Sequence, residues 1–144
     1  MMSNNSYLKV YAKSFNWAGF FLPKKTYTKC SSLYDFCRIV DNLADDLGNL
    51  EVKKNNLSNF KESFNNKEFD NLTIKNMWKL IDDHEISIKI VNDLFDGAES
   101  DLKKNIKINS KKDLLIYSYR VAGTVGLMMA KILNVKNKEA LKSA

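Results

Sequence analysis

The sequence of 144 residues contains one proline and five glycines, which disfavours turn-rich sandwiches and barrels and favours long helices. Its two cysteines, Cys30 and Cys37, would lie two turns apart on a helix and show no zinc-binding spacing, so we expect reduced thiols. No apolar run reaches the roughly 18–20 residues of a membrane span. The first residues also lack the basic start and apolar stretch of a secretory signal. We therefore expect a single cytoplasmic domain.

Negative charge is in short supply, since 23 lysines and arginines outnumber 17 aspartates and glutamates and give a formal net charge of +6. Only Arg38 and Arg120 are arginines, and the lysines are dispersed among asparagines rather than clustered. A nucleic-acid-binding surface would show an arginine-rich stripe, stacking aromatics or a docking motif, and the sequence has none of these. Nucleic acid is therefore not an expected partner. The excess positive charge would still favour an anionic small molecule or an acidic membrane surface.

The apolar periodicity predicts an all-α chain, because no segment alternates with period two for long enough to form a strand. Pro23 and Ser110 suit helix starts, and Gly48 suits a helix end. We expect the well-marked helices at residues 5–13, 24–46, 72–83, 86–103 and 111–133.

Two further segments are less regular. Residues 49–66 are polar and lysine-rich with a stripe of Leu57, Phe60 and Phe64, which predicts a solvent-facing helix and loop. Residues 137–144 begin a new helix without a cap or a polar tail, so we expect the chain to be the front part of a longer protein.

Four side chains near the end of the helix expected at 24–46 carry the strongest chemical signal. Steps of four, three and four residues place them on one helix face: Tyr34, Arg38, Asp41 and Asp45. One interpretation is a solvated face with an Arg38–Asp41 ion pair, which would contribute at most about a few tenths of a kcal/mol. However, Asp41 and Asp45 are like charges one turn apart at the C-terminal end of a helix, where the macrodipole disfavours anions. A divalent cation would offset this repulsion, and carboxylate oxygens suit Mg²⁺.

Two segments resemble the squalene and phytoene synthases, which are head-to-head prenyl transferases with the all-α isoprenoid synthase fold. The first comprises the Ser14-Phe15 pair, the Phe21-Leu22-Pro23 turn and SLYDFCRIVDNLADD at residues 32–46. The second is YSYRVAGTVG at residues 117–126. Between them the resemblance is limited to helical character and a short stretch around Gly97 and Asp101. The resemblance implies that residues 1–144 are the N-terminal portion of a single isoprenoid synthase domain, most like that of a bacterial phytoene synthase.

The resemblance also assigns roles to the first segment. Asp41 and Asp45 match the carboxylates that bind Mg²⁺, with Mn²⁺ as the alternative ion, and Arg38 matches a residue that contacts the diphosphate of the substrate. Tyr34 matches a tyrosine that lines the site. Asn42 departs from the pattern, since many members have another aspartate there.

Two further groups of residues match site positions of the family. Ser14 and Phe15 match a substrate-binding pair in a segment that closes over the diphosphate, although a simple interhelical turn is the other interpretation. Tyr117 matches a catalytic tyrosine that faces the reacting carbons. Four small or apolar residues match the lining of the tunnel for the prenyl tails: Val121, Ala122, Val125 and Gly126. Close packing between helices is the other interpretation of Gly126.

The function that the resemblance implies is the condensation of two geranylgeranyl diphosphates to phytoene through a cyclopropylcarbinyl diphosphate, a step of carotenoid biosynthesis. The alternatives are a squalene or other C30 synthase that uses farnesyl diphosphate, and a non-catalytic helical fragment. Family members carry a second aspartate-rich motif on a later helix, which these residues lack. We therefore expect this chain alone to be inactive and to expose an apolar face. Peripheral association with the inner face of the membrane is expected, because substrate tails and product partition into lipid.

Overall fold

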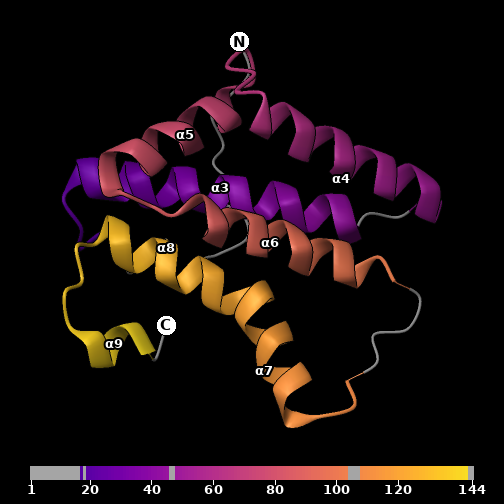
Figure 1. Cartoon of the computed structure of the whole chain (residues 1–144). Coiled ribbons are helices and arrows are strands. Elements are labelled where there is room, and N and C mark those ends of the chain that lie inside the picture. The colour runs from indigo at the N-terminus through magenta and orange to yellow at the C-terminus, as the bar shows by residue number, and fades with distance from the viewer. Residues whose placement is uncertain (1–16, 18, 46–47, 104–107, 143–144) are drawn as a thin grey trace.

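The computed structural model describes residues 17, 19–45, 48–103 and 108–142. Within these ranges the regular structure is helical and contains no strand, which confirms the all-α prediction (Figure 1). The helix expected at 5–13, together with Ser14 and Phe15, lies outside the described residues. The elements in chain order are α3 (Lys24–Asp45), α4 (Leu50–Asn65), α5 (Leu72–His84), α6 (Ile88–Asp101), α7 (Lys111–Ser118), the π-helical segment η1 (Tyr119–Gly123), α8 (Thr124–Ile132) and α9 (Lys138–Lys142).

Helix α3 is the centre of the assembly. It packs against α4, α5, α6 and α8, so the most distant parts of the described chain meet along one helix (Figure 1). Its inward face alternates between steps of three and four residues and is buried at Cys30, Leu33, Cys37, Val40 and Ala44, with Phe36 buried beside them. Pro23 precedes the first helical residue, as the sequence predicts, and the helix ends at Asp45.

The core contains a cluster of phenylalanines from three helices. Phe36 of α3 lies 5.4 Å from Phe64 of α4 and 6.0 Å from Phe95 of α6, measured between ring centroids. Trp78 of α5 stacks on Phe64 at 5.1 Å and donates its Nε1–H to the Phe64 carbonyl at 2.8 Å. Edge and tilted ring pairs at such separations stabilise a core beyond the area they bury.

Residues 49–66 contain the predicted helix, α4, but its apolar stripe belongs to the core, with Leu57 and Phe64 fully buried. The polar and lysine-rich composition reflects the outer face of α4, whereas the residues at positions 57, 60 and 64 form the inner face. The composition of the whole segment therefore did not show how much of the stripe the core buries.

The helix expected at 111–133 is interrupted. Ser110 caps its start by accepting a hydrogen bond from the Asp113 backbone N–H at 3.1 Å, as predicted. The chain then widens into η1, where the backbone N–H of Thr124 donates to the carbonyl of Tyr119, five residues earlier. Thr124 is fully buried and its hydroxyl donates to the Arg120 carbonyl at 2.9 Å, a local bond that competes with the regular helical pattern. Such π-helical turns occur often at functional sites.

Helix α7 extends away from the core and has no buried residue. Leu114, Leu115 and Ile116 are exposed on it. In the part of the chain that the structure describes, no helix is both long enough and apolar enough to cross a membrane.

Candidate functional site

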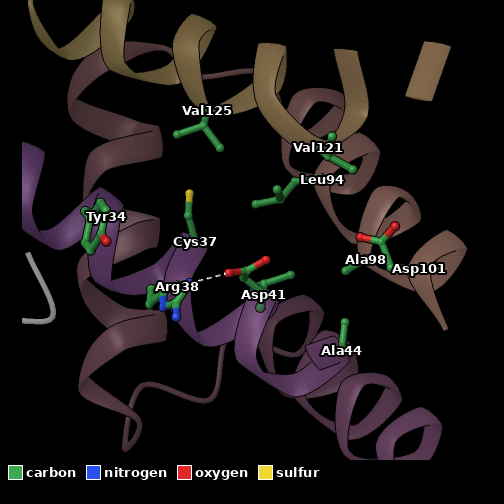
Figure 2. Close-up of a pocket in the computed structure, with 11 residues that line it drawn as sticks. Tyr34, Cys37, Arg38, Asp41, Ala44, Leu94, Ala98, Asp101, Val121 and Val125 are labelled. Carbon is green, nitrogen blue, oxygen red and sulfur yellow. Dashed lines mark hydrogen bonds and ion pairs between the residues drawn. The ribbon is translucent and has the colours of Figure 1, made fainter. Parts of the chain in front are cut away.

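A pocket of about 220 Å³ lies between α3, α6 and the η1–α8 segment (Figure 2). Arg38 and Asp41 lie on its polar side, and Figure 2 shows Val121 and Val125 opposite them. The pocket is lined by Tyr34, Cys37, Arg38, Val40, Asp41, Ala44, Leu94, Ala98, Asp101, Val121 and Val125. The structure therefore brings together both segments that carry the resemblance, although about seventy residues separate them in the sequence.

The polar side is organised by an ion pair within α3. The Nη1 atom of Arg38 donates to Oδ2 of Asp41 at 2.6 Å, and both side chains are partly exposed. Partial burial raises the pKa of the Asp41 carboxyl above its ordinary value, and the charge of Asp45 raises it further, while Arg38 acts in the opposite direction. Asp101 contributes a smaller increase. The carboxylates here therefore carry more negative charge than Arg38 alone neutralises.

Asp45 and Tyr117 lie beside the pocket rather than in its lining. Asp45 is the last residue of α3, one turn beyond Asp41, and its charge acts on both Asp41 and Tyr117. The hydroxyl of Tyr117 donates to Oδ1 of Asp101 at 2.7 Å, and this hydrogen bond is the main reason why the pKa of Tyr117 is raised. Tyr117 is therefore linked to the pocket by its hydrogen bond to Asp101, which is part of the pocket lining.

The sequence did not identify Asp101 as a site residue. Its carboxylate lies at the last residue of α6 and joins the polar side of the pocket because α6 packs against α3. The available signal was its position four residues after Gly97 in the short stretch that resembles the family between the two main motifs.

Two of the four predicted tunnel residues line the pocket. Val121 and Val125, one turn apart, are in its lining, whereas Ala122 and Gly126 are not, and Ala122 is exposed. The η1 segment lies very close to α6: a Cβ atom added at Gly97 would lie 3.1 Å from the backbone carbon and oxygen of Arg120. Gly97 thus permits an approach that places Val121 over the pocket.

Polar bonds to α6 reinforce this approach. Tyr119 donates its hydroxyl to Oδ2 of Asp93 at 3.0 Å, and the same oxygen accepts from Lys89 at 2.8 Å. Arg120 lies 3.7 Å from Asp96, which also faces Lys61 of α4 at 3.6 Å. Together with the Tyr117–Asp101 hydrogen bond, these contacts fix the second motif to α6 on both sides of Gly97.

A family model for squalene/phytoene synthase matches residues 8–144. The chain belongs to this family.

Its relatives are phytoene synthases by name. The chain is 27% identical over 129 residues to phytoene synthase 1, chloroplastic, of Solanum lycopersicum, and the match covers 87% of this chain and 31% of that relative. It is 25% identical over 134 residues to the 15-cis-phytoene synthase of Synechococcus elongatus, which covers 88% of this chain and 42% of that relative. A bifunctional lycopene cyclase/phytoene synthase of Pyrenophora tritici-repentis is 27% identical over 143 residues, with 88% and 24% covered. The chain thus spans well under half the length of these curated relatives.

The family implies a magnesium ion, and the carboxylates at the end of α3 are its candidate ligands. Among the described residues, no group of three or more histidine, cysteine or acidic side chains could hold a metal by itself. Mg²⁺, however, is usually bound by one or two carboxylates and completes its shell with water and phosphate oxygens. Asp41 and Asp45 supply such a pair, and a cation would relieve the repulsion that raises the pKa of Asp41. The donor set fits a Mg²⁺–diphosphate unit and does not form an all-protein cage.

The cysteines have no chemical role in this pocket. Both are free, as the sequence predicts, and both are buried. Burial, together with the nearby Asp41 charge, raises the pKa of Cys37 to about 12, so its thiol stays protonated at neutral pH. A protonated thiol is a poor nucleophile, and Cys37 serves as an apolar wall of the pocket.

Proposed function

We propose that this protein is a head-to-head prenyl transferase that joins two geranylgeranyl diphosphates to form phytoene. The observation that carries the proposal is the composition of the pocket. One side gathers Arg38, Asp41 and Asp101, and the other presents Val121 and Val125. A prenyl diphosphate has the same two parts, a compact anion and an apolar chain.

The charged side would take the diphosphate. The guanidinium of Arg38 is already held at the pocket by Asp41, and its planar fork suits phosphate oxygens. Asp41 and Asp45 would hold Mg²⁺, which supplies neutralisation of the charge that develops on the departing diphosphate. Arg38 would then exchange its carboxylate partner for the diphosphate oxygens and stabilise the same charge.

The apolar side would protect the carbocations. Departure of the first diphosphate leaves an allylic cation, and attack by the double bond of the second molecule with loss of a proton gives the cyclopropylcarbinyl diphosphate. Loss of the second diphosphate, rearrangement and loss of another proton yield the hydrocarbon. Val121, Val125 and Leu94 would exclude water that otherwise captures each cation.

Tyr117 would act beside these cations. Because its O–H donates to Asp101, the lone pairs of the phenolic oxygen stay free of that bond. Their partial negative charge would stabilise a neighbouring cation and orient the departing proton. Asp101 holds the hydroxyl in this orientation, which makes it a positioning residue.

The choice of geranylgeranyl over farnesyl diphosphate rests on the names of the relatives, which are phytoene synthases. The pocket volume of about 220 Å³ is below the range of roughly 300–1,000 Å³ that is usual for ligand sites. These residues therefore account for the diphosphate and the first carbons, and tail length would be selected elsewhere. A C30 synthase that uses farnesyl diphosphate is the second candidate.

An NMR titration tests the proposal. An unreactive geranylgeranyl thiolodiphosphate, added with Mg²⁺, is expected to shift the methyl resonances of Val121 and Val125 and to leave those of Val52, an exposed valine on α4, unchanged. Inorganic pyrophosphate with Mg²⁺ should perturb the Arg38 and Asp41 backbone but not these methyl groups. Because these residues account for the first carbons only, the length of the product, C40 or C30, separates phytoene synthesis from the second candidate. Equal perturbation at Val52, or none at Val121 and Val125, would favour a non-catalytic helical fragment.

A further inference from the structure

The π-helical segment η1 separates α7 from α8, and residues that serve the pocket lie on both sides of it. Tyr117 precedes η1, Val121 lies within it and Val125 follows it. Val121 and Val125 line the pocket (Figure 2), and Tyr117 is hydrogen-bonded to Asp101 of the same lining. Three side chains at intervals of four residues therefore serve one side of the segment.

Steps of four residues do not stay in line along a regular helix. With about 3.6 residues per turn, each step of four overshoots a full turn by about 40°, and two steps overshoot by about 80°. Within η1 the hydrogen bonds reach back five residues instead of four, so the turn is wider and the same step falls short of a full turn. The shortfall offsets the overshoot, which keeps Tyr117 directed to the side of Val121 and Val125.

The hydroxyl of Thr124 completes the hydrogen bonding of η1. In a regular helix the backbone N–H of Thr124 would donate to the Arg120 carbonyl, four residues earlier, but here it donates to Tyr119. The Arg120 carbonyl accepts the Thr124 hydroxyl at 2.9 Å instead, so it keeps a partner from the same residue. Thr124 is fully buried, and the bond is therefore protected from competing water.

The contact with α6 makes this hydroxyl bond matter. A Cβ atom at Gly97 would lie 3.1 Å from the carbonyl carbon and oxygen of Arg120, so the carbonyl that accepts the hydroxyl is packed directly on α6. Thr28 of α3 makes the same kind of bond, to the Lys24 carbonyl at 3.0 Å, but at an exposed position in a regular helix. A threonine hydroxyl does not widen a helix by itself, and burial against α6 distinguishes Thr124.

We propose that Thr124 is a positioning residue: its hydroxyl holds η1 wide, and η1 keeps Tyr117 in line with the two valines. The importance of this alignment for catalysis rests on the proposed function, in which Tyr117 stabilises cations that Val121 and Val125 protect from water. Without the hydroxyl, the Arg120 carbonyl would recover the backbone N–H of residue 124. The turn would then become regular, and Tyr117 would rotate away from the pocket.

Three substitutions and NMR couplings across hydrogen bonds test the wide turn. Thr124→Val removes the hydroxyl and keeps the shape of the side chain, Thr124→Ser keeps the hydroxyl, and Thr28→Val is the matched control in a regular helix. The backbone N–H of residue 124 should couple to the Tyr119 carbonyl in the wild type, Thr124→Ser and Thr28→Val. In Thr124→Val it should couple to the Arg120 carbonyl. The wild-type hydroxyl proton of Thr124 should also exchange slowly with water, and fast exchange would overturn the proposal even if Thr124→Val does not fold.

The titration of Tyr117 reports whether the alignment is lost. The hydrogen bond to Asp101 is the main reason why the pKa of Tyr117 lies above its ordinary value of 10.0. This pKa should fall toward the ordinary value in Thr124→Val and stay raised in Thr124→Ser and Thr28→Val, with Asp101→Asn as the reference for a lost bond. A substitution that only lowers stability would leave the pKa of Tyr117 in the folded chain unchanged.

Binding separates the role of Thr124 from the proposed function. Thr124→Val should bind geranylgeranyl thiolodiphosphate with Mg²⁺ about tenfold more weakly, comparable to losing the burial of about two methylene groups, and should bind inorganic pyrophosphate unchanged. No binding of the analogue to the wild type would refute the proposed function alone, because the couplings and the Tyr117 titration would still decide the role of Thr124. A Thr124→Val chain that keeps the Tyr119 coupling and the raised pKa, or a Thr28→Val chain that loses them, would overturn the proposal.

Discussion

Substitution of Gly97 by alanine probes the contact that holds the second motif over the pocket. The added Cβ would lie 3.1 Å from the carbonyl carbon, the carbonyl oxygen and the Cβ of Arg120. Carbon atoms prefer separations of about 3.5–4.0 Å, so the shortfall is about 0.4 Å or more at each atom. Two of the three atoms belong to the backbone, which means that η1 itself must move to relieve the overlap.

Two effects of opposite sign decide the magnitude for Gly97→Ala. Overpacking costs about 1–3 kcal/mol, and the higher helix propensity of alanine in α6 recovers up to about 1 kcal/mol. We expect a net decrease of about 1–2 kcal/mol in the free energy of unfolding, measured by urea denaturation followed by circular dichroism. Gly48→Ala is the control, because no atom lies within 4 Å of its added Cβ, and its stability should change by less than about 0.5 kcal/mol. A Gly97→Ala protein as stable as the wild type would refute the close approach of α6 and η1.

Three other changes give measurable outcomes. Glu85 ends α5 with a φ of 50°, a left-handed conformation that glycine adopts more readily, so Glu85→Gly should raise the free energy of unfolding by up to about 1 kcal/mol in the same urea assay. Asp101→Asn and Tyr117→Phe should be coupled by about 0.5–1.5 kcal/mol in a double-mutant cycle, because they share one hydrogen bond, and strictly additive effects would contradict it. Because folding raises the pKa of Asp41 above 3.8, its ionisation opposes folding at neutral pH, so Asp41→Asn should be more stable than the wild type there. That advantage should disappear as the pH falls below about 3.8, and urea denaturation at several pH values would show whether it persists.

Much of α3 could be predicted from the sequence because its boundaries and its functional face follow from local rules. Pro23 fixes the start, and the face of Tyr34, Arg38 and Asp41 follows from helical geometry, so the expected helix agrees with the observed one from Lys24 to Asp45, the last described residue before 46–47. These three residues all line the pocket.

The rest of the site depends on contacts between distant segments, which local patterns do not encode. Asp101 lines the pocket because α6 packs against α3, and it holds Tyr117, sixteen residues later, at the site. Val121 reaches the pocket because Gly97 admits the neighbouring backbone. The π-helical turn was not predicted because its residues keep an ordinary helical composition. Ala122 fell on the wrong side of this turn for the pocket, and its role in a tunnel, like that of Gly126, stays a prediction.

The central claim is that the end of α3 receives a diphosphate together with Mg²⁺. Isothermal titration of the chain with inorganic pyrophosphate tests it most directly, with and without Mg²⁺ and in Asp41→Asn, using Asp82→Asn in α5 as the matched control. We expect pyrophosphate to bind only with Mg²⁺, at least about tenfold more weakly to Asp41→Asn, and with unchanged affinity to Asp82→Asn. Binding that is indifferent to Asp41, or no binding in the presence of Mg²⁺, would contradict it.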